Sequence, residues 1–297
     1  MDNRKETRRP DSQYQDMLRT VLTKGELKKD TPQGKAVRMI FGELSPLVYP
    51  IANGFPVINE RKMGWKGPIG EMCAFINGIQ DFEVMKTEFG VPAAFWDPWV
   101  IERKTIRAHA KLGHLGDASY GPALARFPMA DNQTFDQFQN AIDMLCDPQL
   151  RDRRTIYLHP WIPYWNSWGG DQRAVVSPCH GWMHFRVIDG ELDLLSWHRS
   201  ADLPLGFPND MISYSALLLM MSQVTGIPPR KIIFQFGDAH IYEDQFDMVE
   251  EMIGRKPLQL PRLWVDPLVT ELQDFRSHHF ELRDYNPHPA IRIPGSV

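Results

Sequence analysis

Cys179 is the residue whose neighbours point most clearly to chemistry. It lies between Pro178 and His180, and Arg199 and Ser200 follow in the next segment of the chain. A thiolate is a strong nucleophile, and a nearby cation lowers the pKa of a thiol. Most free cysteines are instead small buried hydrophobes. Local spacing alone favours neither interpretation, a nucleophile facing a phosphate-bearing substrate or a core thiol.

Two arginine-containing segments are candidates for holding that phosphate. Arg153-Arg154 and Arg199-Ser200 offer guanidinium groups and a hydroxyl, which bind a phosphate dianion through charge-assisted hydrogen bonds. An isolated arginine pair is more often part of a solvated turn. Because two such clusters flank the candidate nucleophile, we favour anion binding.

A metal site at the same cysteine is a weaker interpretation. His180 and His184 are separated by a spacing that aligns side chains on a helix but not on a strand. The sequence has no second cysteine pair and no HExxH pattern. We therefore expect no metal.

Three other groups could contribute to a site. Glu71 lies in a very apolar segment, so it is either a surface carboxylate or a buried acid that handles protons. His240 and Tyr242 alternate and share one face of a strand, where they could bind sugar hydroxyls or where His240 could be a satisfied core residue. Trp96 to Trp99 could form a flat wall, although aromatic residues are more often core.

These residues need a scaffold of helices and strands. Hydrophobic spacing predicts helices over 16–27, 68–78, 135–146 and 210–225. Asn209 is the expected N-cap of the last helix, and Gly226 is its expected end. Extended segments are expected over 36–49, 155–158, 231–236 and on both sides of the hairpin signal Asp189-Gly190. Residues 105–127 show no period and are interpreted as a functional loop.

The chain shows no internal repeat and no linker. A single α+β domain over residues 16–297 is therefore the economical prediction, with residues 1–15 forming a flexible N-terminal tail. At 297 residues the chain is long enough to bury a large core.

Composition excludes several classes of protein. Hydrophobic residues make up 43% and charged residues 24%, as in ordinary globular proteins, and the formal charge of -4 argues against general nucleic-acid binding. Three widely spaced cysteines favour a reducing compartment over a disulfide framework. The polar N-terminus does not resemble a signal peptide, and no apolar run is long enough to span a membrane. We expect a cytoplasmic protein.

Several motifs occur in an order that resembles the thymidylate synthase superfamily. The resemblance covers the chain from roughly Asp16 to the C-terminus. Weaker matches occur around Glu71, Trp96, Tyr120 and Arg153. The strongest matches are Pro178-Cys179-His180, Arg199-Ser200-Ala201-Asp202, Leu205-Gly206-Phe207-Pro208, Ser213-Tyr214 and Gly237-Asp238-Ala239-His240-Ile241-Tyr242.

This resemblance implies a thymidylate-synthase-like fold in which a large mixed sheet is flanked by helices, and a homodimer whose sheets pack back to back. It also implies 5,10-methylenetetrahydrofolate as co-substrate and a pyrimidine nucleotide as substrate. The implied catalytic residues are Cys179, Glu71, Asp210 and Tyr120. The implied nucleotide ligands are Arg199, Ser200, His240 and Tyr242, with Arg153 and Arg154 reaching across from the other subunit. The implied folate-binding residues are Trp96, Asp202, Gly206 and Tyr214.

Asp210 departs from the family pattern. Thymidylate synthases carry Phe-Asn at the position of Asn209-Asp210, and that Asn amide both accepts and donates on the uracil edge. A carboxylate has no donor for the O4 atom of uracil but accepts well from the amine of cytosine. Asp210 therefore resembles the deoxycytidylate hydroxymethylase branch.

The sequence thus predicts a cytidylate 5-hydroxymethyltransferase. A cytidylate C5-methylase, a thymidylate synthase and a non-catalytic nucleotide- or RNA-binding relative are the alternatives. CMP and dCMP are both possible substrates. The family's early-loop arginine has no clear counterpart, and Lys35 or Arg38 could replace it. His184 stands where the family usually has Gln.

Overall fold

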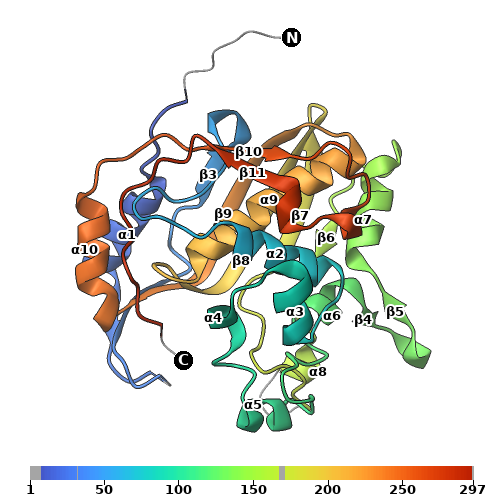
Figure 1. Ribbon diagram of the computed structural model, residues 1–297, viewed down its shortest axis with the longest axis horizontal. Coiled ribbons are helices and arrows are strands. Elements are labelled where there is room, and N and C mark those ends of the chain that lie inside the picture. The colour runs from blue at the N-terminus through green and yellow to red at the C-terminus, as the bar shows by residue number, and fades with distance from the viewer. Residues whose placement is uncertain (1–7, 32, 167–170, 296–297) are drawn as a thin grey trace.

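The computed structural model describes residues 8–31, 33–166 and 171–295. A seven-stranded mixed sheet in the order β1-β2-β9-β8-β7-β6, with β3 also paired to β9, organises the fold. The predicted α+β architecture with helices flanking a large mixed sheet is confirmed (Figure 1). The strands of this sheet are β1 (Glu26–Lys28), β2 (Val37–Phe41), β3 (Leu47–Pro50), β6 (Tyr157–Leu158), β7 (Trp182–Ile188), β8 (Glu191–Asp202) and β9 (Pro229–Tyr242).

Helices pack around this sheet, and short two-stranded ribbons complete the fold (Figure 1). The ribbons pair β4 (Phe127–Pro128) with β5 (Thr134–Phe135) and β10 (Arg262–Val265) with β11 (Phe280–Arg283). The helices are α1 (Gln13–Lys24), α2 (Lys66–Ile76), α3 (Phe82–Phe89), α4 (Ala93–Trp96), α5 (Glu102–Arg107), α6 (Tyr120–Ala125), α7 (Gln137–Cys146), α8 (Pro163–Asn166), α9 (Phe207–Thr225) and α10 (Phe246–Gly254).

The β7–β8 hairpin forms as the sequence predicts. Asp189 and Gly190 both have positive φ, 54° and 81°, the conformation that a two-residue type I′ turn requires. Burial then alternates along β7, and along β8 from Leu194 to Arg199. The hairpin thereby directs one row of side chains into the core.

Helix α9 connects β8 to β9, which run parallel. Parallel neighbours need such a crossover, and α9 is buried along most of its length beneath the sheet. The register pairs Ser200 with Asp238 and Asp202 with His240. Because of this pairing, polar residues from two distant segments meet at one end of the parallel strands.

The structure corrects several predicted boundaries. The first helix ends at Lys24, and Leu27 belongs to β1. The predicted 36–49 strand is two strands separated by a turn at Gly42, whose φ is 74°. The 231–236 strand extends from Pro229 to Tyr242, so the glycine at its centre does not end it. Residues 1–7 of the predicted tail lie outside the described residues, and residues 13–15 are not tail, because they form the start of α1 with Tyr14 and Gln15 buried.

Two local predictions are wrong. Segment 105–127 is not all loop, because it contains the end of α5 and the whole of α6, helices too short to show a period. Asn209 does not cap α9, since Gly206 precedes that helix and the Asn209 amide donates to the carbonyl of Leu205 at 2.9 Å. Pro208 is compatible with the start of α9 at Phe207, because N–H groups in the first turn of a helix have no acceptor within the helix and proline has no N–H.

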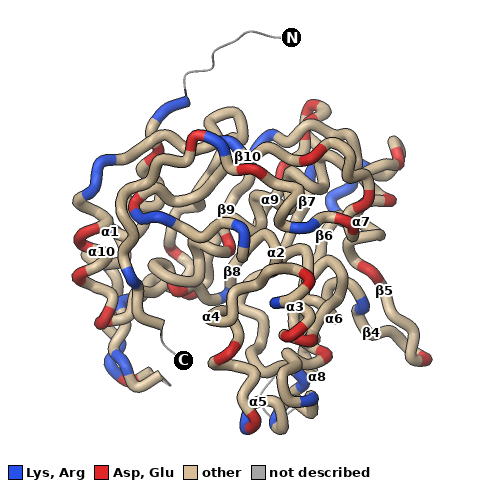
Figure 2. Tube along the Cα trace, viewed as in Figure 1, with Lys and Arg blue, Asp and Glu red and all other residues tan. Residues whose placement is uncertain are grey.

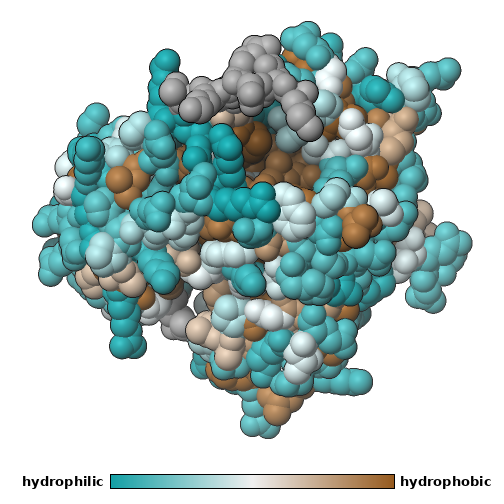
Figure 3. Space-filling view, turned by 45° about the horizontal axis from the view of Figure 1, so that its top comes forward, coloured by the Kyte–Doolittle hydropathy of each residue, from teal (hydrophilic) through white to brown (hydrophobic). Residues whose placement is uncertain are grey.

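Acidic and basic residues are interspersed along the trace in Figure 2, so no single-sign face appears in that view. Hydrophilic residues cover most of the face in Figure 3, with apolar patches between them. Within the described part of the chain, no helix combines the length and apolar character needed to cross a membrane.

Candidate active site

Cys179 lies in the short segment that leads into β7, beside β8. Its carbonyl accepts hydrogen bonds from the backbone N–H groups of Arg199 at 2.9 Å and Ser200 at 3.3 Å. Its own N–H donates to the hydroxyl of Tyr120 at 2.8 Å. The backbone of the candidate nucleophile is therefore fixed from two sides, by β8 and by α6.

The Arg199 guanidinium lies directly at the thiol, with Nη2 3.3 Å from Sγ of Cys179. The same guanidinium donates to the carbonyls of Pro178 at 2.7 Å and Ser177 at 2.9 Å, which hold it in place. Burial raises the pKa of Cys179, and the positive charge of Arg199 opposes that rise. Arg199 thus favours the thiolate, whereas the burial of Cys179 disfavours its charged form.

Asp210 and His180 contact each other near the thiol. Asp210 Oδ1 is 3.3 Å from Nε2 of His180, and the carboxylate is near enough to raise the pKa of Cys179. Burial lowers the pKa of His180 to about 4, so its imidazole is neutral near pH 7. The hydroxyl of Tyr214 contacts His180 Nδ1 at 2.5 Å, and the Tyr120 ring stacks on the imidazole at 4.4 Å.

Glu71 is a buried acid, so the surface-carboxylate alternative is wrong. It is 8% exposed on α2, and the indole N–H of Trp96 donates to its Oε1 at 2.6 Å. Burial raises the pKa of Glu71 to about 8, the Trp96 hydrogen bond opposes this, and the charge of Asp210 adds to it. Glu71 is thus mainly protonated at neutral pH while Asp210 lies nearby, an arrangement suited to proton transfer.

His240 and Tyr242 lie on the same face of β9, as alternation predicts, with ring centroids 5.1 Å apart. His240 Nδ1 is 2.6 Å from Oδ1 of Asp238. Because Asp238 pairs with Ser200 in the sheet register, the hydroxyl of Ser200 and these side chains gather at one end of β8 and β9. This end offers several polar groups to a hydroxylated ligand.

The residues proposed to face folate lie in two places, with Asp202 and Gly206 just before α9 and with Trp96 and Tyr214 beside Glu71 and His180. The carboxylate of Asp202 accepts from the backbone N–H of Leu205 at 3.1 Å and from the amide of Gln245, and the N–H of Gly206 donates to its carbonyl. Burial raises the pKa of Asp202. Trp96 bonds to Glu71, and Tyr214, 1% exposed, lies among the side chains around His180.

Arg153 and Arg154 are not part of this cluster. Both are exposed in the turn between α7 and β6, and among the described residues no ion pair or hydrogen bond joins either side chain to the Cys179 pocket. Lys35 pairs with Asp244, and Arg38 donates to the carbonyl of Gly25 at 3.1 Å.

Two polar residues of the site escaped sequence analysis. His198 is fully buried next to Asp210, and Gln245 donates to Asp202. A signal for His198 was present, because it occupies an inward position of an alternating strand where an apolar residue is expected. Gln245 follows the end of β9, and its sequence context carries no such signal.

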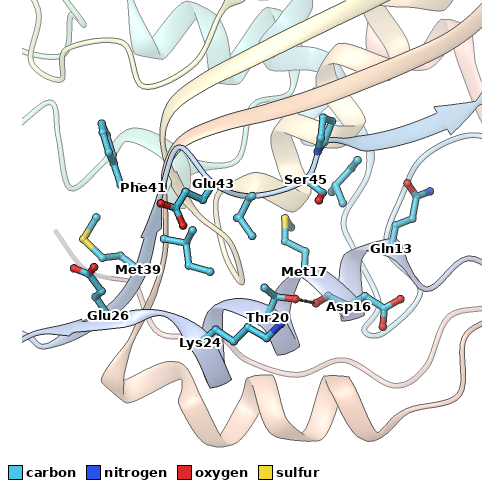
Figure 4. A pocket seen from close by; sticks show the side chains of 14 residues that line it. Gln13, Asp16, Met17, Thr20, Lys24, Glu26, Met39, Phe41, Glu43 and Ser45 are labelled. Carbon is cyan, nitrogen blue, oxygen red and sulfur yellow. Dashed lines mark hydrogen bonds between the residues drawn. The ribbon is translucent and has the colours of Figure 1, made fainter.

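A groove of about 930 Å³ lies elsewhere, between α1 and the β2–β3 segment (Figure 4). Its lining mixes Asp16, Glu26 and Glu43 with apolar side chains such as Met17, and it includes none of the predicted site residues. The described residues contain no group of three or more His, Cys, Asp or Glu side chains arranged to hold a metal ion. That no metal takes part in the reaction stays a prediction.

The fold and the site together define an α+β protein with a thiol beside an arginine, one buried and one partly buried carboxyl group, and polar side chains at one end of the parallel strands. The family model described as thymidylate synthase matches residues 12–297, and the chain belongs to this family. Its members are folate-dependent one-carbon transferases that act on pyrimidine nucleotides and work as dimers.

Proposed function

We propose that this protein is a (deoxy)cytidylate 5-hydroxymethyltransferase. The observation that carries the proposal is the carboxylate of Asp210 in the pocket of Cys179, 3.3 Å from an imidazole that is neutral near pH 7. A carboxylate accepts hydrogen bonds and donates none, so it matches the exocyclic amine of cytosine and leaves the O4 atom of uracil without a donor.

In the proposed reaction, the Cys179 thiolate adds to C6 of the base, and C5 becomes the nucleophile. Arg199 favours the thiolate before this step and contacts the phosphate together with Ser200. 5,10-Methylenetetrahydrofolate supplies the one-carbon unit that C5 attacks. Glu71 relays protons as the C5 proton and tetrahydrofolate leave. Water then adds to the exocyclic methylene, and departure of Cys179 restores the C5–C6 double bond.

The residues near α9 support binding of a folate. The Asp202 carboxylate is largely buried yet retains acceptor capacity toward the N–H groups of a pterin ring, and Gln245 holds its orientation. Trp96 places an indole plane beside Glu71. Gly206 precedes α9, and its backbone N–H donates to the carbonyl of Asp202. We propose that this region faces the co-substrate.

The proposed dimer has the outer faces of two sheets packed back to back. The side chains on that face of β7 and β8 are half-exposed in the single chain, and they include Trp182 and Trp197, whose rings lie 5.2 Å apart. An uncovered aromatic surface of this kind is typical of an interface. In such a dimer, we propose that Arg153 and Arg154 reach the phosphate site of the other subunit.

The test is incubation of the enzyme with 5,10-methylenetetrahydrofolate and dCMP, CMP or dUMP in separate and competing reactions. A 5-hydroxymethylcytidylate product with tetrahydrofolate supports the proposal. Dihydrofolate and a methylated product identify the C5-methylase instead, and preference for dUMP identifies a thymidylate synthase. Competition between CMP and dCMP decides which sugar is used.

A non-catalytic binding protein is the alternative from another class. Release of tritium from cytidylates labelled at C5 reports addition of the thiol to C6, because that step makes the C5 hydrogen labile. We expect release by the wild-type protein and none by Cys179→Ala. Absence of release from both dCMP and CMP by the wild-type protein would favour the binding protein.

A further inference from the structure

His198 lies behind Asp210 in an otherwise aromatic environment. Its side chain on β8 is fully buried. Ring centroids of Phe207, Phe236 and Tyr214 lie within 5.6 to 5.8 Å of its imidazole. A purely apolar side chain would fill this space without the desolvation cost of two ring nitrogens. We therefore infer that the imidazole of His198 forms a hydrogen bond that an apolar side chain could not form.

The polar contacts of His198 are few. Its Nε2 lies 3.3 Å from the hydroxyl of Ser196, and its Nδ1 lies 3.5 Å from Oδ2 of Asp210. Within the described residues, Nδ1 has no partner at hydrogen-bond geometry. A buried donor without a partner is costly, and the Asp210 carboxylate is the acceptor that a small rotation of either side chain would bring into range.

The opposite oxygen of Asp210 has a similar neighbour. Oδ1 faces Nε2 of His180, and Nδ1 of His180 contacts the hydroxyl of Tyr214. If Tyr214 donates its O–H to Nδ1, the ring proton of the neutral imidazole is on Nε2 and points at Asp210. The carboxylate then lies between two imidazoles, one at each oxygen.

We propose that His198 is a positioning residue that donates Nδ1–H to Oδ2 of Asp210, with Ser196 donating its hydroxyl proton to Nε2. Together with His180, it holds the Asp210 carboxylate in one orientation, because each carboxylate oxygen then accepts one N–H from an imidazole. The lone pairs that remain can only accept, so a ligand that presents an N–H donor is selected. This last step rests on the proposed function, whereas the His198–Asp210 contact does not.

The first test reads the proton position directly. Nitrogen-15 NMR of the histidine rings in the full-length protein distinguishes the Nδ1–H tautomer from the Nε2–H tautomer, with His198→Gln assigning the signal. We expect His198 as the Nδ1–H tautomer, and the same tautomer in Ser196→Ala, because Asp210 holds the proton. An Nε2–H tautomer in the wild-type protein means that His198 donates to Ser196 and overturns the proposal.

The second test compares two variants in steady-state turnover of cytidylate and uridylate. His198→Phe fills the aromatic space but has no donor, whereas His198→Gln keeps an amide N–H that can reach Asp210. We expect the cytidylate-to-uridylate ratio of kcat/KM to fall by about 10- to 100-fold in His198→Phe. In His198→Gln we expect it to stay within about threefold of the wild type.

The two results separate this proposal from the proposed function. An unchanged selectivity ratio in a folded His198→Phe protein overturns the positioning role even if the wild-type enzyme prefers cytidylate. A wild-type preference for uridylate overturns the proposed function, and the NMR tautomer then still decides the His198–Asp210 contact. Should His198→Phe fail to fold, the tautomer of the wild-type protein remains the deciding measurement.

Discussion

The pocket around Cys179 and the turn carrying Arg153 and Arg154 differ in how far one chain completes them. In the pocket, Tyr120 and Arg199 hold the nucleophile through contacts within the chain. In the turn, both arginines are exposed, and among the described residues no hydrogen bond or ion pair orients their side chains. The charged groups around Cys179 are therefore held in place before a substrate binds. The side chains of Arg153 and Arg154 would instead be ordered by contact with another surface.

The largest effect on activity is expected from a substitution next to Cys179. Asp210→Asn replaces one acceptor oxygen with an amide donor, which no longer suits the cytosine amine but can donate to O4 of uracil. We expect kcat/KM for cytidylate to fall by about 100- to 1000-fold and turnover of uridylate to rise. Parallel assays with the two nucleotides measure this change.

Asp189→Asn is the matched control, because it makes the same substitution at the exposed hairpin tip, where asparagine also tolerates the positive φ. It should leave both activities unchanged. If Asp210→Asn kept its preference for cytidylate, base choice would have to come from another residue.

The elements of the pocket were predictable because local signals specify them. Asp189-Gly190 sets the hairpin, and the alternation along β9 sets the shared face of His240 and Tyr242. Order of motifs was enough to associate Cys179 with Arg199, and the structure places them 3.3 Å apart. Such signals depend on neighbours in sequence, or on motifs that a whole family shares.

Burial and long-range pairing were not predictable in the same way. The sequence around Glu71 is compatible with a surface acid or a buried one, and the hydrogen bond from the Trp96 indole that accompanies its burial depends on tertiary packing. The contact of His198 with Asp210 joins a strand to a helix, and nothing in the spacing of these residues along the chain measures that distance. The position of α9 relative to β8 decides it, and this depends on packing of the whole core.

The next effect concerns the turn. The double variant Arg153→Ala/Arg154→Ala removes guanidinium groups proposed to hold the phosphate of the neighbouring subunit. We expect the KM for the nucleotide to rise by about 10- to 100-fold, since each charge-assisted hydrogen bond is worth more than a neutral one. Arg103→Ala/Arg107→Ala removes two exposed arginines of α5 and serves as the control for loss of charge.

Subunit mixing decides whether the arginines act across the interface. A dimer of one Cys179→Ala chain and one Arg153→Ala/Arg154→Ala chain has one site with an intact thiol and intact partner arginines. Random reassembly after co-refolding should therefore restore about a quarter of the wild-type sites at low nucleotide concentration. No recovery above the two parent variants would mean that each chain supplies its own arginines or none.

The last effect is on stability rather than on turnover, and it sharpens the contrast between buried and exposed charge. The pKa of Glu71 is raised from 4.5 to about 8 mainly by burial, so between these pH values the folded state binds more protons than the unfolded state. The free energy of unfolding of the wild type should therefore fall as the pH rises through this window. Glu71→Gln cannot ionise, keeps an oxygen for the Trp96 indole and should lose that dependence.

Urea denaturation at pH 5 and pH 8 measures the difference. The free energy of unfolding of Glu71→Gln minus that of the wild type should be larger at pH 8 than at pH 5, by an amount of the order of a few kcal/mol. Glu88→Gln, at an exposed position on α3, should show no such change. An equal stability difference at both pH values would mean that Glu71 ionises as freely as a surface acid. Ionisation of Glu71 would then not destabilise the folded protein, as is expected for the exposed charges of Arg153 and Arg154.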